Sequence, residues 1–343
     1  MKRMQKVSII VLAFIVGAFF VVSPSFAKSY KWKIGQPMPE GTFLFDATEQ
    51  LVKDISKATE GRITVTHYPG DLLGDVTLQN KNVMIGTQEM AISWPTAAEN
   101  PKWVLMSVPF MFRSYNHAAE AYKPGGWWQT VAAPIAKACN WKILGSVPLG
   151  FTGIVGSAKW DAMPTKKSIK VRVMGDDLVK KAVDAMGFNT VTIPWGEIHS
   201  SLALRTVDGA WGPTASDDFK MFLDVAKFGY MYRYNFAITP FFMNLDLFNT
   251  LSPEDQAILE KTAAAWTEKT WATYADYENK QFEEMAKAGR LVYLSAQEWT
   301  ANADKVRKEI WPLFEPILGQ DLYKQLWEKA DRLPVDKGTD DPY

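Results

Sequence analysis

The sequence has little cysteine, little histidine and no excess of either charge, and each shortage excludes a class of protein. Cys139 is the only cysteine in 343 residues, so no intramolecular disulfide can form, and we expect it to be a small buried hydrophobe. The histidines, His67, His117 and His199, lack the spacing of metal ligands. Lys+Arg and Asp+Glu both number 38, without the basic excess of a nucleic-acid-binding protein. We therefore expect no metal, no cofactor and no nucleic-acid partner.

The short motifs of common enzyme classes are also missing. The chain has no G-x-S-x-G nucleophile elbow. Gly145 and Gly150 are followed by Phe151-Thr152, where a phosphate-binding loop has Lys and Ser or Thr. A periplasmic enzyme stays open as the alternative of another class, because catalytic groups need not be close in sequence. Turnover of a bound molecule would distinguish an enzyme from a binding protein.

Only the N-terminus carries a long hydrophobic run. Basic residues at positions 2, 3 and 6 precede an apolar stretch from Val7 to Val22, and small residues stand at Ser25 and Ala27. This pattern predicts a signal peptide over residues 1–27, cleaved after Ala27, and export to the periplasm. The apolar stretch is shorter than the roughly 20 residues of a membrane span. Without the signal peptide, 35 basic and 38 acidic residues give a formal charge of −3.

Aromatic residues are abundant. The chain has 14 Trp and 19 Phe, while its 47% hydrophobic and 22% charged residues are typical of a soluble globular protein. Tryptophan combines a large apolar surface with an N–H donor and readily lines ligand pockets. The aromatic excess therefore favours a protein that binds a small molecule.

Apolar residues alternate between strand spacing and helix spacing along the chain, in two series. This order predicts βαβ units and mainly parallel sheets in two lobes. The first series has strands at Tyr30–Ile34 and Ile63–Val65 around a helix at Phe43–Ala58. The second series has strands at Ile169–Val173, Thr190–Ile193 and after Val207–Gly209, and helices at Asp176–Met186, capped by Gly187, and Glu197–Leu204.

A long helix is predicted near the C-terminal end. Ser252 is a suitable N-cap, Pro253 suits the first helical position, and Asp255 can close a capping box. Helical patterning continues to about Lys287, with room for a break, and Ala288-Gly289 ends it. About thirty-five residues at 1.5 Å each span about 50 Å, more than a single small lobe. We therefore expect this helix to lie across both lobes.

Seven motifs occur in the order found in one family of transport proteins. Together they resemble the DctP-type solute-binding proteins of tripartite ATP-independent periplasmic (TRAP) transporters, over residues 30 to 320. The seven are Thr59–Val65, Tyr68–Gly74, Val108–Arg113, Lys170–Val173, Pro194–Glu197, Val207–Gly209 and Leu251–Gln256.

The resemblance implies a two-lobed periplasmic binding protein of the α/β class, with mixed, mainly parallel sheets and a long helix bridging both lobes. We expect a signal peptide at 1–27, lobe I at 28–149 plus about 238–270, lobe II at 150–237 plus about 271–325, and a C-terminal tail at 326–343. We also expect a monomer that closes on a small organic carboxylate and delivers it to a TRAP permease, driven by an ion gradient. The alternatives are an ABC-type binding protein or a ligand sensor for another anion, such as a dicarboxylate or sulfonate.

Arg172 is the leading candidate for ligand binding. It lies on the strand face opposite to Val171 and Val173, near a carboxyl end, where open α/β sheets bind ligands. Its guanidinium is permanently charged and offers a planar fork that matches two carboxylate oxygens. Its place in Lys170–Val173 also matches the arginine that the resembling proteins use to grip a carboxylate.

Other positions point to the character of the ligand. Trp195 stands where the resembling proteins place an aromatic ring against the ligand. Trp211 offers an indole where relatives commonly have polar residues ending in Asn, and Thr152 stands where many carry a second arginine. These losses disfavour a dicarboxylate or a sialic-acid-like ligand, and favour a monoanion with an aromatic or apolar body. The predicted ligand-binding set is Arg172, Trp195, Trp211, Phe151, Thr152, Trp94, Asn235 and Phe43.

Overall fold

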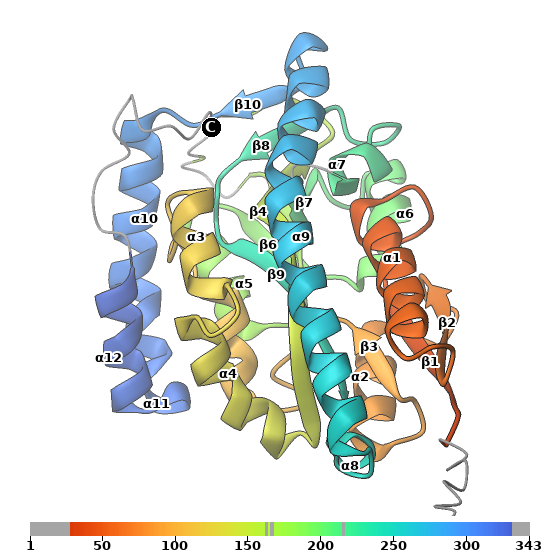
Figure 1. The fold of residues 1–343 in the computed structure, drawn as a ribbon. Coiled ribbons are helices and arrows are strands. Elements are labelled where there is room, and N and C mark those ends of the chain that lie inside the picture. The colour runs from red at the N-terminus through yellow and green to blue at the C-terminus, as the bar shows by residue number, and fades with distance from the viewer. Residues whose placement is uncertain (1–27, 162–163, 165–167, 215–216, 331–343) are drawn as a thin grey trace, which may run out of the picture.

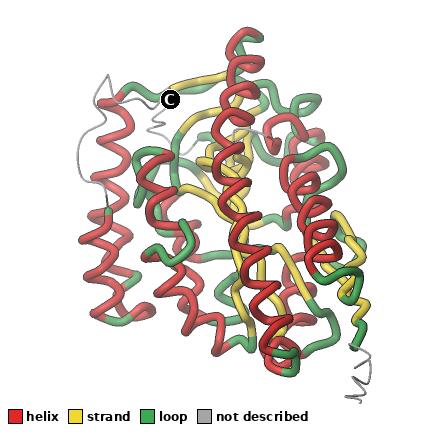
Figure 2. The backbone as a smooth tube through the Cα atoms, viewed as in Figure 1, coloured by secondary structure: helices red, strands yellow, loops and turns green. Residues whose placement is uncertain are grey.

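The structure is a computed structural model that describes residues 28–161, 164, 168–214 and 217–330. The strands run through the middle of the molecule among the helices, as Figure 2 shows. No helix in these ranges is long and apolar enough to cross a membrane. The predicted signal peptide and residues 331–343 of the predicted tail lie outside the described residues.

The first strand–helix–strand series is confirmed and forms one lobe. β1 (Tyr30–Gln36), α1 (Phe43–Ala58) and β2 (Ile63–Pro69) follow one another along the chain. α2 (Val76–Ile85) then leads to β3 (Met90–Ile92). β1 lies between β2 and β3 and pairs with both in parallel, so the carboxyl ends of all three strands meet at one edge.

Local chemistry sets the start and the buried face of α1. α1 begins at Phe43 because the Thr42 hydroxyl accepts a hydrogen bond from the backbone N–H of Phe45 at 3.3 Å. Its apolar residues Leu44, Leu51 and Ile55 recur at helical spacing and are buried.

The second series forms the other lobe, also as predicted. β5 (Lys170–Val173), α5 (Asp177–Ala185) and β6 (Asn189–Thr192) are followed by α6 (Ile198–Ala203) and β7 (Gly209–Thr214). β5 pairs in parallel with both β6 and β7. Gly187, the predicted cap after α5, has φ of +104°, in the region that favours glycine.

Two long antiparallel strands connect the lobes. β4 (Trp141–Gly156) pairs with β9 (Phe236–Asn244), and its far end pairs with β7 and with β8 (Phe228–Met231). β10 (Leu291–Tyr293) adds to β8 in parallel. The main path of the sheet is therefore β2-β1-β3-β9-β4-β7-β5-β6.

Of the remaining helices, some pack on the sheet and others pack on helices. α10 packs against α5, and Figure 1 shows α10, α11 and α12 together along one side of the molecule. α12 continues past the predicted tail boundary at 326. The helices and 3₁₀ turns whose bounds are not yet given are η1 (Pro101–Ser107), α3 (Tyr115–Tyr122), α4 (Trp127–Ala138), η2 (Trp195–Glu197), α7 (Asp217–Met221), α8 (Leu245–Asn249), α10 (Ala296–Ile310), η3 (Trp311–Leu313), α11 (Glu315–Leu318) and α12 (Gln320–Lys329).

The predicted long helix is α9 (Pro253–Lys287), an unbroken helix of 35 residues. The Ser252 hydroxyl caps it by accepting a hydrogen bond from the backbone N–H of Asp255 at 3.1 Å. The prediction that Asp255 closes a capping box was wrong. Its carboxylate instead pairs with the guanidinium of Arg62, just before β2, and this ion pair ties the start of α9 to the first lobe.

α9 contributes to the hydrophobic cores of both lobes. Leu259, Ala263 and Trp266 pack in the cluster that contains the apolar residues of β1 and α1. Near the other end, Phe282 and Met285 pack in the cluster that contains the apolar residues of α6. Figure 1 shows α9 running along the length of the molecule, from the level of β10 and β8 to that of α8. The predicted bridging role of the helix is therefore confirmed.

Replacing Trp266 with phenylalanine is expected to lower the free energy of unfolding by about 1–2 kcal/mol. Its indole N–H donates to the carbonyl of Ala47 in α1 at 2.7 Å, so the change removes a buried hydrogen bond between α9 and α1. Urea denaturation measures the loss. Trp299→Phe is the matched control, because the indole N–H of Trp299 is buried without a partner among the described residues. Equal losses in the two variants would contradict the prediction.

Candidate functional site

Arg172 lies in β5 with its guanidinium buried between lobe II backbone carbonyls. Its Nε donates to the carbonyl of Ile193 at 2.7 Å, and its Nη1 donates to the carbonyl of Trp211 at 3.1 Å. The residue is 3% exposed, while Val171 and Val173 belong to the core cluster shared with α5. The strand alternation predicted from the sequence thus separates the cation from the apolar core face.

The charge of Arg172 has no anionic partner within the described ranges, where no ion pair involves it. Burial lowers the pKa of the guanidinium to about 10, so it stays cationic at neutral pH. A buried cation without a counter-charge is destabilising, because it has lost its water. Its two carbonyl partners offset only part of that loss. An anion bound there would supply the missing counter-charge.

Two tryptophans from different lobes contact each other, and one of them also contacts this cation. The guanidinium carbon of Arg172 lies 5.7 Å from the ring centre of Trp195, within the range of a cation–π interaction. The rings of Trp195 and Trp94 are 6.1 Å apart. Trp94 follows β3 in lobe I, whereas Trp195 begins η2 in lobe II, so this contact crosses between the lobes. The structure thus brings Arg172, Trp195 and Trp94 together.

Trp211 contributes its backbone to the cation and its ring to the core. The indole packs edge-on against Tyr234 at 5.1 Å, and its N–H is buried with no partner among the residues described. The next residue, Gly212, leaves room beside the guanidinium. A Cβ there would lie 3.5 Å from Nη1 of Arg172 and 3.9 Å from the ring of Trp195.

Thr152 and Asn235 pair with each other at the crossing of β4 and β9. The Thr152 hydroxyl donates to Oδ1 of Asn235 at 2.5 Å, and the Asn235 amide donates to the carbonyl of Met106 at 3.2 Å. Both side chains are buried. The geometry therefore assigns them hydrogen bonds between segments of the protein, and their contact with a ligand stays a prediction.

The last two predicted residues face other aromatic rings. Phe151 packs edge-on against Phe236 at 5.0 Å. Phe43 contacts Tyr274 and Tyr277 of α9, at 5.0 Å and 5.1 Å. The structure therefore places both rings in packing contacts, and their role in ligand binding also stays a prediction.

Sequence reasoning missed a second buried arginine. Arg233 lies between β8 and β9, is 6% exposed, and its guanidinium lies 5.6 Å from the ring centre of Phe151. Its φ is +47°, an unusual conformation for a residue other than glycine. No local sequence pattern predicts such a conformation, because the segments that pack around the crossing strands impose it.

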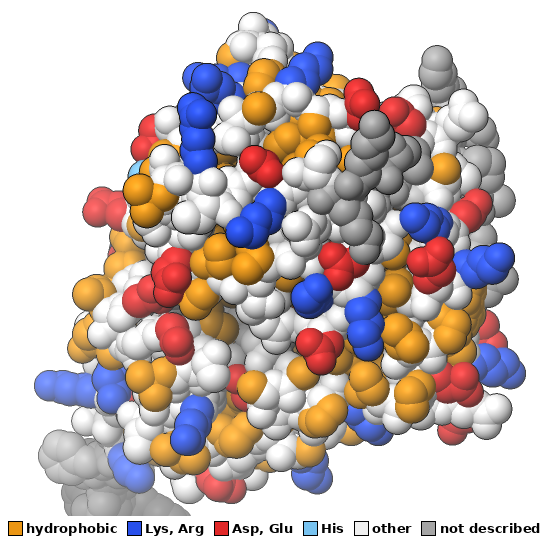
Figure 3. Space-filling view, turned by 180° about the vertical axis from the view of Figure 1, so that it is seen from behind, with side chains coloured by type: hydrophobic (Ala, Val, Ile, Leu, Met, Phe, Trp, Pro, Cys, Tyr) orange, Lys and Arg blue, Asp and Glu red, His pale blue; other side chains and the backbone are white. Residues whose placement is uncertain are grey.

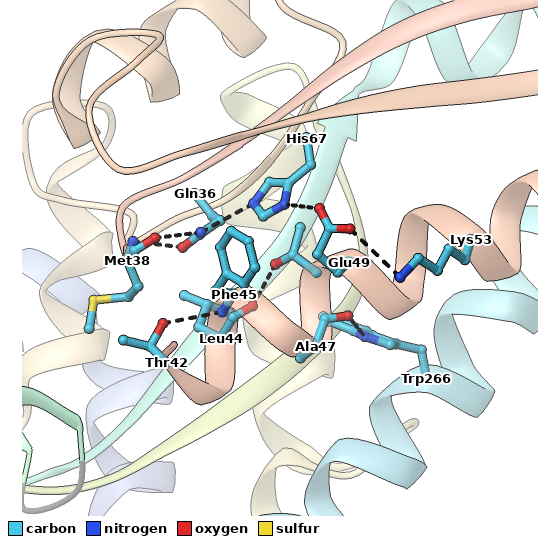
Figure 4. Close-up of polar contacts among 11 residues, drawn as sticks. Gln36, Met38, Thr42, Leu44, Phe45, Ala47, Glu49, Lys53, His67 and Trp266 are labelled. Atoms are coloured by element: carbon cyan, nitrogen blue, oxygen red, sulfur yellow. Dashed lines mark hydrogen bonds and ion pairs between the residues drawn. The ribbon is translucent and has the colours of Figure 1, made fainter. Parts of the chain in front are cut away.

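A histidine network at the carboxyl ends of β1 and β2 was also missed, and Figure 4 shows it. Nδ1 of His67 lies 2.7 Å from a Glu49 oxygen, and its Nε2 lies 3.2 Å from the amide nitrogen of Gln36. The same amide nitrogen of Gln36 donates to the carbonyl of Met38, and the amide oxygen accepts from the N–H of Met38, each at 2.6 Å. Both ring nitrogens are thus engaged, and the network holds the turn after β1.

A cavity of about 160 Å³ lies away from this site, between α4, β4 and α9. Its lining includes Tyr122, Trp128 and Thr267, but none of the eight predicted ligand-binding residues. No group of three or more His, Cys, Asp or Glu among the described residues could hold a metal ion. On the face seen in Figure 3, basic and acidic side chains are interspersed, so this face carries no patch of one sign.

Relatives of this chain are known from sequence. The profile of the DctP family, described as bacterial extracellular solute-binding protein, family 7, matches residues 34–315. A 2,3-diketo-L-gulonate-binding periplasmic protein of Escherichia coli K12 is 24% identical over 80% of this chain and 84% of its own length. A monocarboxylate 2-oxoacid-binding periplasmic protein of Nostoc is 26% identical over 87% of this chain and 82% of its own length.

Solved structures with a similar fold are also known. A TRAP periplasmic solute-binding protein from Desulfovibrio salexigens, solved with bound orotic acid, matches with a TM-score of 0.80. The two are 20% identical, and the match covers 88% of this chain and 98% of that one. The family profile itself extends from β1 to the start of α11. This chain therefore belongs to the DctP family of bacterial extracellular solute-binding proteins, which serve TRAP transporters, as the order of its motifs predicted.

Proposed function

We propose that this protein is a periplasmic solute-binding protein that captures a small organic carboxylate between its lobes and delivers it to a TRAP permease. Arg172 binds the carboxylate, and Trp195 and Trp94 cover the body of the ligand. The signal-peptide pattern of residues 1–27 supports the location. The relatives from Escherichia coli and Nostoc are named as periplasmic proteins, which supports it further.

The observation that carries this proposal is the buried guanidinium of Arg172, which forms no ion pair with a described residue. Nε and one hydrogen of Nη1 are used by the carbonyls of Ile193 and Trp211, whereas Nη2 makes no hydrogen bond to a described residue. The end of the fork thus remains for a carboxylate, whose two oxygens match the two terminal nitrogens. An acid bound there supplies the missing counter-charge.

The surroundings of Arg172 favour one negative charge and a flat or apolar body. One indole lies beside the cation and contacts a second indole, and the side of Gly212 that lacks a Cβ faces both the cation and the first indole. The Nostoc relative is named for monocarboxylate 2-oxoacids, and orotic acid, seen in the Desulfovibrio protein, is a flat ring with one carboxylate. Both support a monocarboxylate ligand here.

Binding is coupled to closure of the lobes. The contact between Trp94 and Trp195 joins lobe I to lobe II next to the indole that contacts Arg172, so the ligand must enter when the lobes are apart. A ligand that touches both indoles and the guanidinium binds the closed form more tightly than the open form. The permease then recognises the closed form.

A thermal-shift panel tests the ligand class. Orotate, phenylacetate and 4-methyl-2-oxopentanoate are compared with succinate, glucuronate and taurine. We expect one of the first three to give the largest rise in Tm, because ligand at about 100 times Kd contributes roughly 2.7 kcal/mol. Stabilisation by succinate alone would overturn the proposed ligand class and favour the dicarboxylate alternative. If no acid of the panel raises Tm, capture of a carboxylate is contradicted.

The same samples separate binding from catalysis. We expect each stabilising acid to be recovered unchanged after prolonged incubation with the protein, as NMR of the acid would record. Native mass spectrometry of protein purified without refolding would identify an acid that copurifies. Conversion of the acid into a product would revive the enzyme alternative.

A further inference from the structure

Helix α2 buries two amide side chains beside the core residue Val83 and exposes two large apolar ones, which departs from the usual pattern of a surface helix. Gln79 and Asn80 are 1% and 0% exposed, whereas Leu78 and Ile85 are 47% and 60% exposed. Each buried amide has an oxygen with no hydrogen-bond partner in the part of the chain described. A buried oxygen without a partner is destabilising, so the role of each amide nitrogen needs an explanation.

The amide nitrogen of Asn80 holds the loop that carries Trp94. It donates to the backbone carbonyl of Trp94 at 2.8 Å and lies 3.3 Å from Oε1 of Glu99. The other oxygen of Glu99 accepts hydrogen bonds from the backbone N–H and the hydroxyl of Thr96, at 2.7 Å and 2.9 Å. Because both partners of the Asn80 nitrogen are acceptors, the orientation of the amide is fixed.

This loop is linked to the cation through Trp195. Trp94 contacts Trp195 at 6.1 Å, and Trp195 in turn lies 5.7 Å from the guanidinium carbon of Arg172. A shift of the Trp94 carbonyl would move its indole relative to the other lobe. The position of the lobe I indole therefore depends on a hydrogen bond made by a fully buried amide.

We propose that Asn80 is a positioning residue of the binding site, which fixes the carbonyl of Trp94 and thereby sets where the Trp94 indole meets Trp195, the ring that contacts Arg172. This inference rests on the function proposed above. It explains why α2 tolerates an amide oxygen without a partner on its buried face. Asn80 acts through Trp94 and does not need to touch the ligand.

Gln79, the preceding residue, provides a matched control. Its amide nitrogen donates to the carbonyl of Gly74 at 2.7 Å and lies 3.4 Å from the carbonyl of Gly70. Its burial and its unpartnered oxygen match those of Asn80. It differs in the loop that it holds, which follows β2 and does not carry Trp94. Gln79→Met therefore reports the purely structural loss.

The test is fluorine NMR of the full protein labelled with 5-fluorotryptophan. Trp94→Phe and Trp195→Phe identify the two signals of the inter-lobe pair. We expect Asn80→Leu to shift or broaden both signals, and Gln79→Met to leave them in place. An unchanged Trp94 signal in Asn80→Leu, or an equal change in Gln79→Met, would overturn the proposal. If Asn80→Leu fails to fold, Asn80→Ser replaces it, with the same expectation.

Binding adds a second readout with a separate outcome. With orotate or 4-methyl-2-oxopentanoate as probe, we expect Asn80→Leu to raise Kd about fivefold to tenfold, and Gln79→Met less than about twofold. Equal values of Kd in the two variants would overturn the positioning role. If the unmodified protein binds no acid of the panel, the proposed function fails, while the NMR spectra still decide whether Asn80 positions Trp94.

Discussion

Replacing Arg172 with alanine is expected to weaken binding of a monocarboxylate by about tenfold to a hundredfold. The guanidinium donates charge-assisted hydrogen bonds from a site 3% exposed, and such a bond contributes about 1.5–3 kcal/mol. Its pKa of about 10 keeps the charge in place at neutral pH. Isothermal titration calorimetry measures the change with the acid that gives the largest thermal shift.

Two further variants show whether the effect belongs to the fork or to charge in general. Lys170→Ala removes a cation from the same strand, but its side chain is exposed, so Kd should stay the same. Arg172→Lys keeps a charge and loses the planar fork, so binding should remain weakened. Affinity that is unchanged in Arg172→Ala would reject the assignment.

Replacing Gly150 with alanine is expected to lower the free energy of unfolding by about 3–5 kcal/mol, as measured by urea denaturation. Gly150 lies in β4 where the strand passes between the lobes, and its φ is +86°. A Cβ there would lie 1.9 Å from Oε1 of Glu278 and 2.8 Å from the hydroxyl of Tyr274. Glu278 is buried in α9 and has little room to move.

Gly289→Ala separates the two causes of that loss. Gly289 also has positive φ, at +67°, but no heavy atom of a described residue lies within 4 Å of its hypothetical Cβ. This variant should lose about 1 kcal/mol, from backbone strain alone. Similar losses in the two variants would show that packing against Glu278 and Tyr274 is unimportant.

Elements whose chemistry is local were predictable from the sequence. α1 has the predicted bounds Phe43–Ala58, because its cap and its apolar spacing lie within the segment itself. α9 begins at Pro253 for the same reason. The capping box at Asp255 was wrong because its carboxylate found a distant partner, Arg62, which no local pattern reveals.

In the candidate site, the position of a residue was predictable where it follows from the residue's own strand. Arg172 alternates with Val171 and Val173, so the sequence alone placed it off the core face. The pairing of Thr152 with Asn235 depends on two strands far apart in the chain, and the conformation of Arg233 depends on the crossing between lobes. Long-range packing decides such features, and periodicity does not encode it.

The sequence by itself determined the family, the order of strands and helices, and the strand face on which the proposed carboxylate-binding Arg172 lies, because these depend on motifs and on spacing within short segments. Only the tertiary structure decided that Trp94 reaches Trp195 from the other lobe, and that Asn80 holds the carbonyl of Trp94. Contacts between lobes join residues distant in the chain, and their geometry arises when the two cores pack along α9.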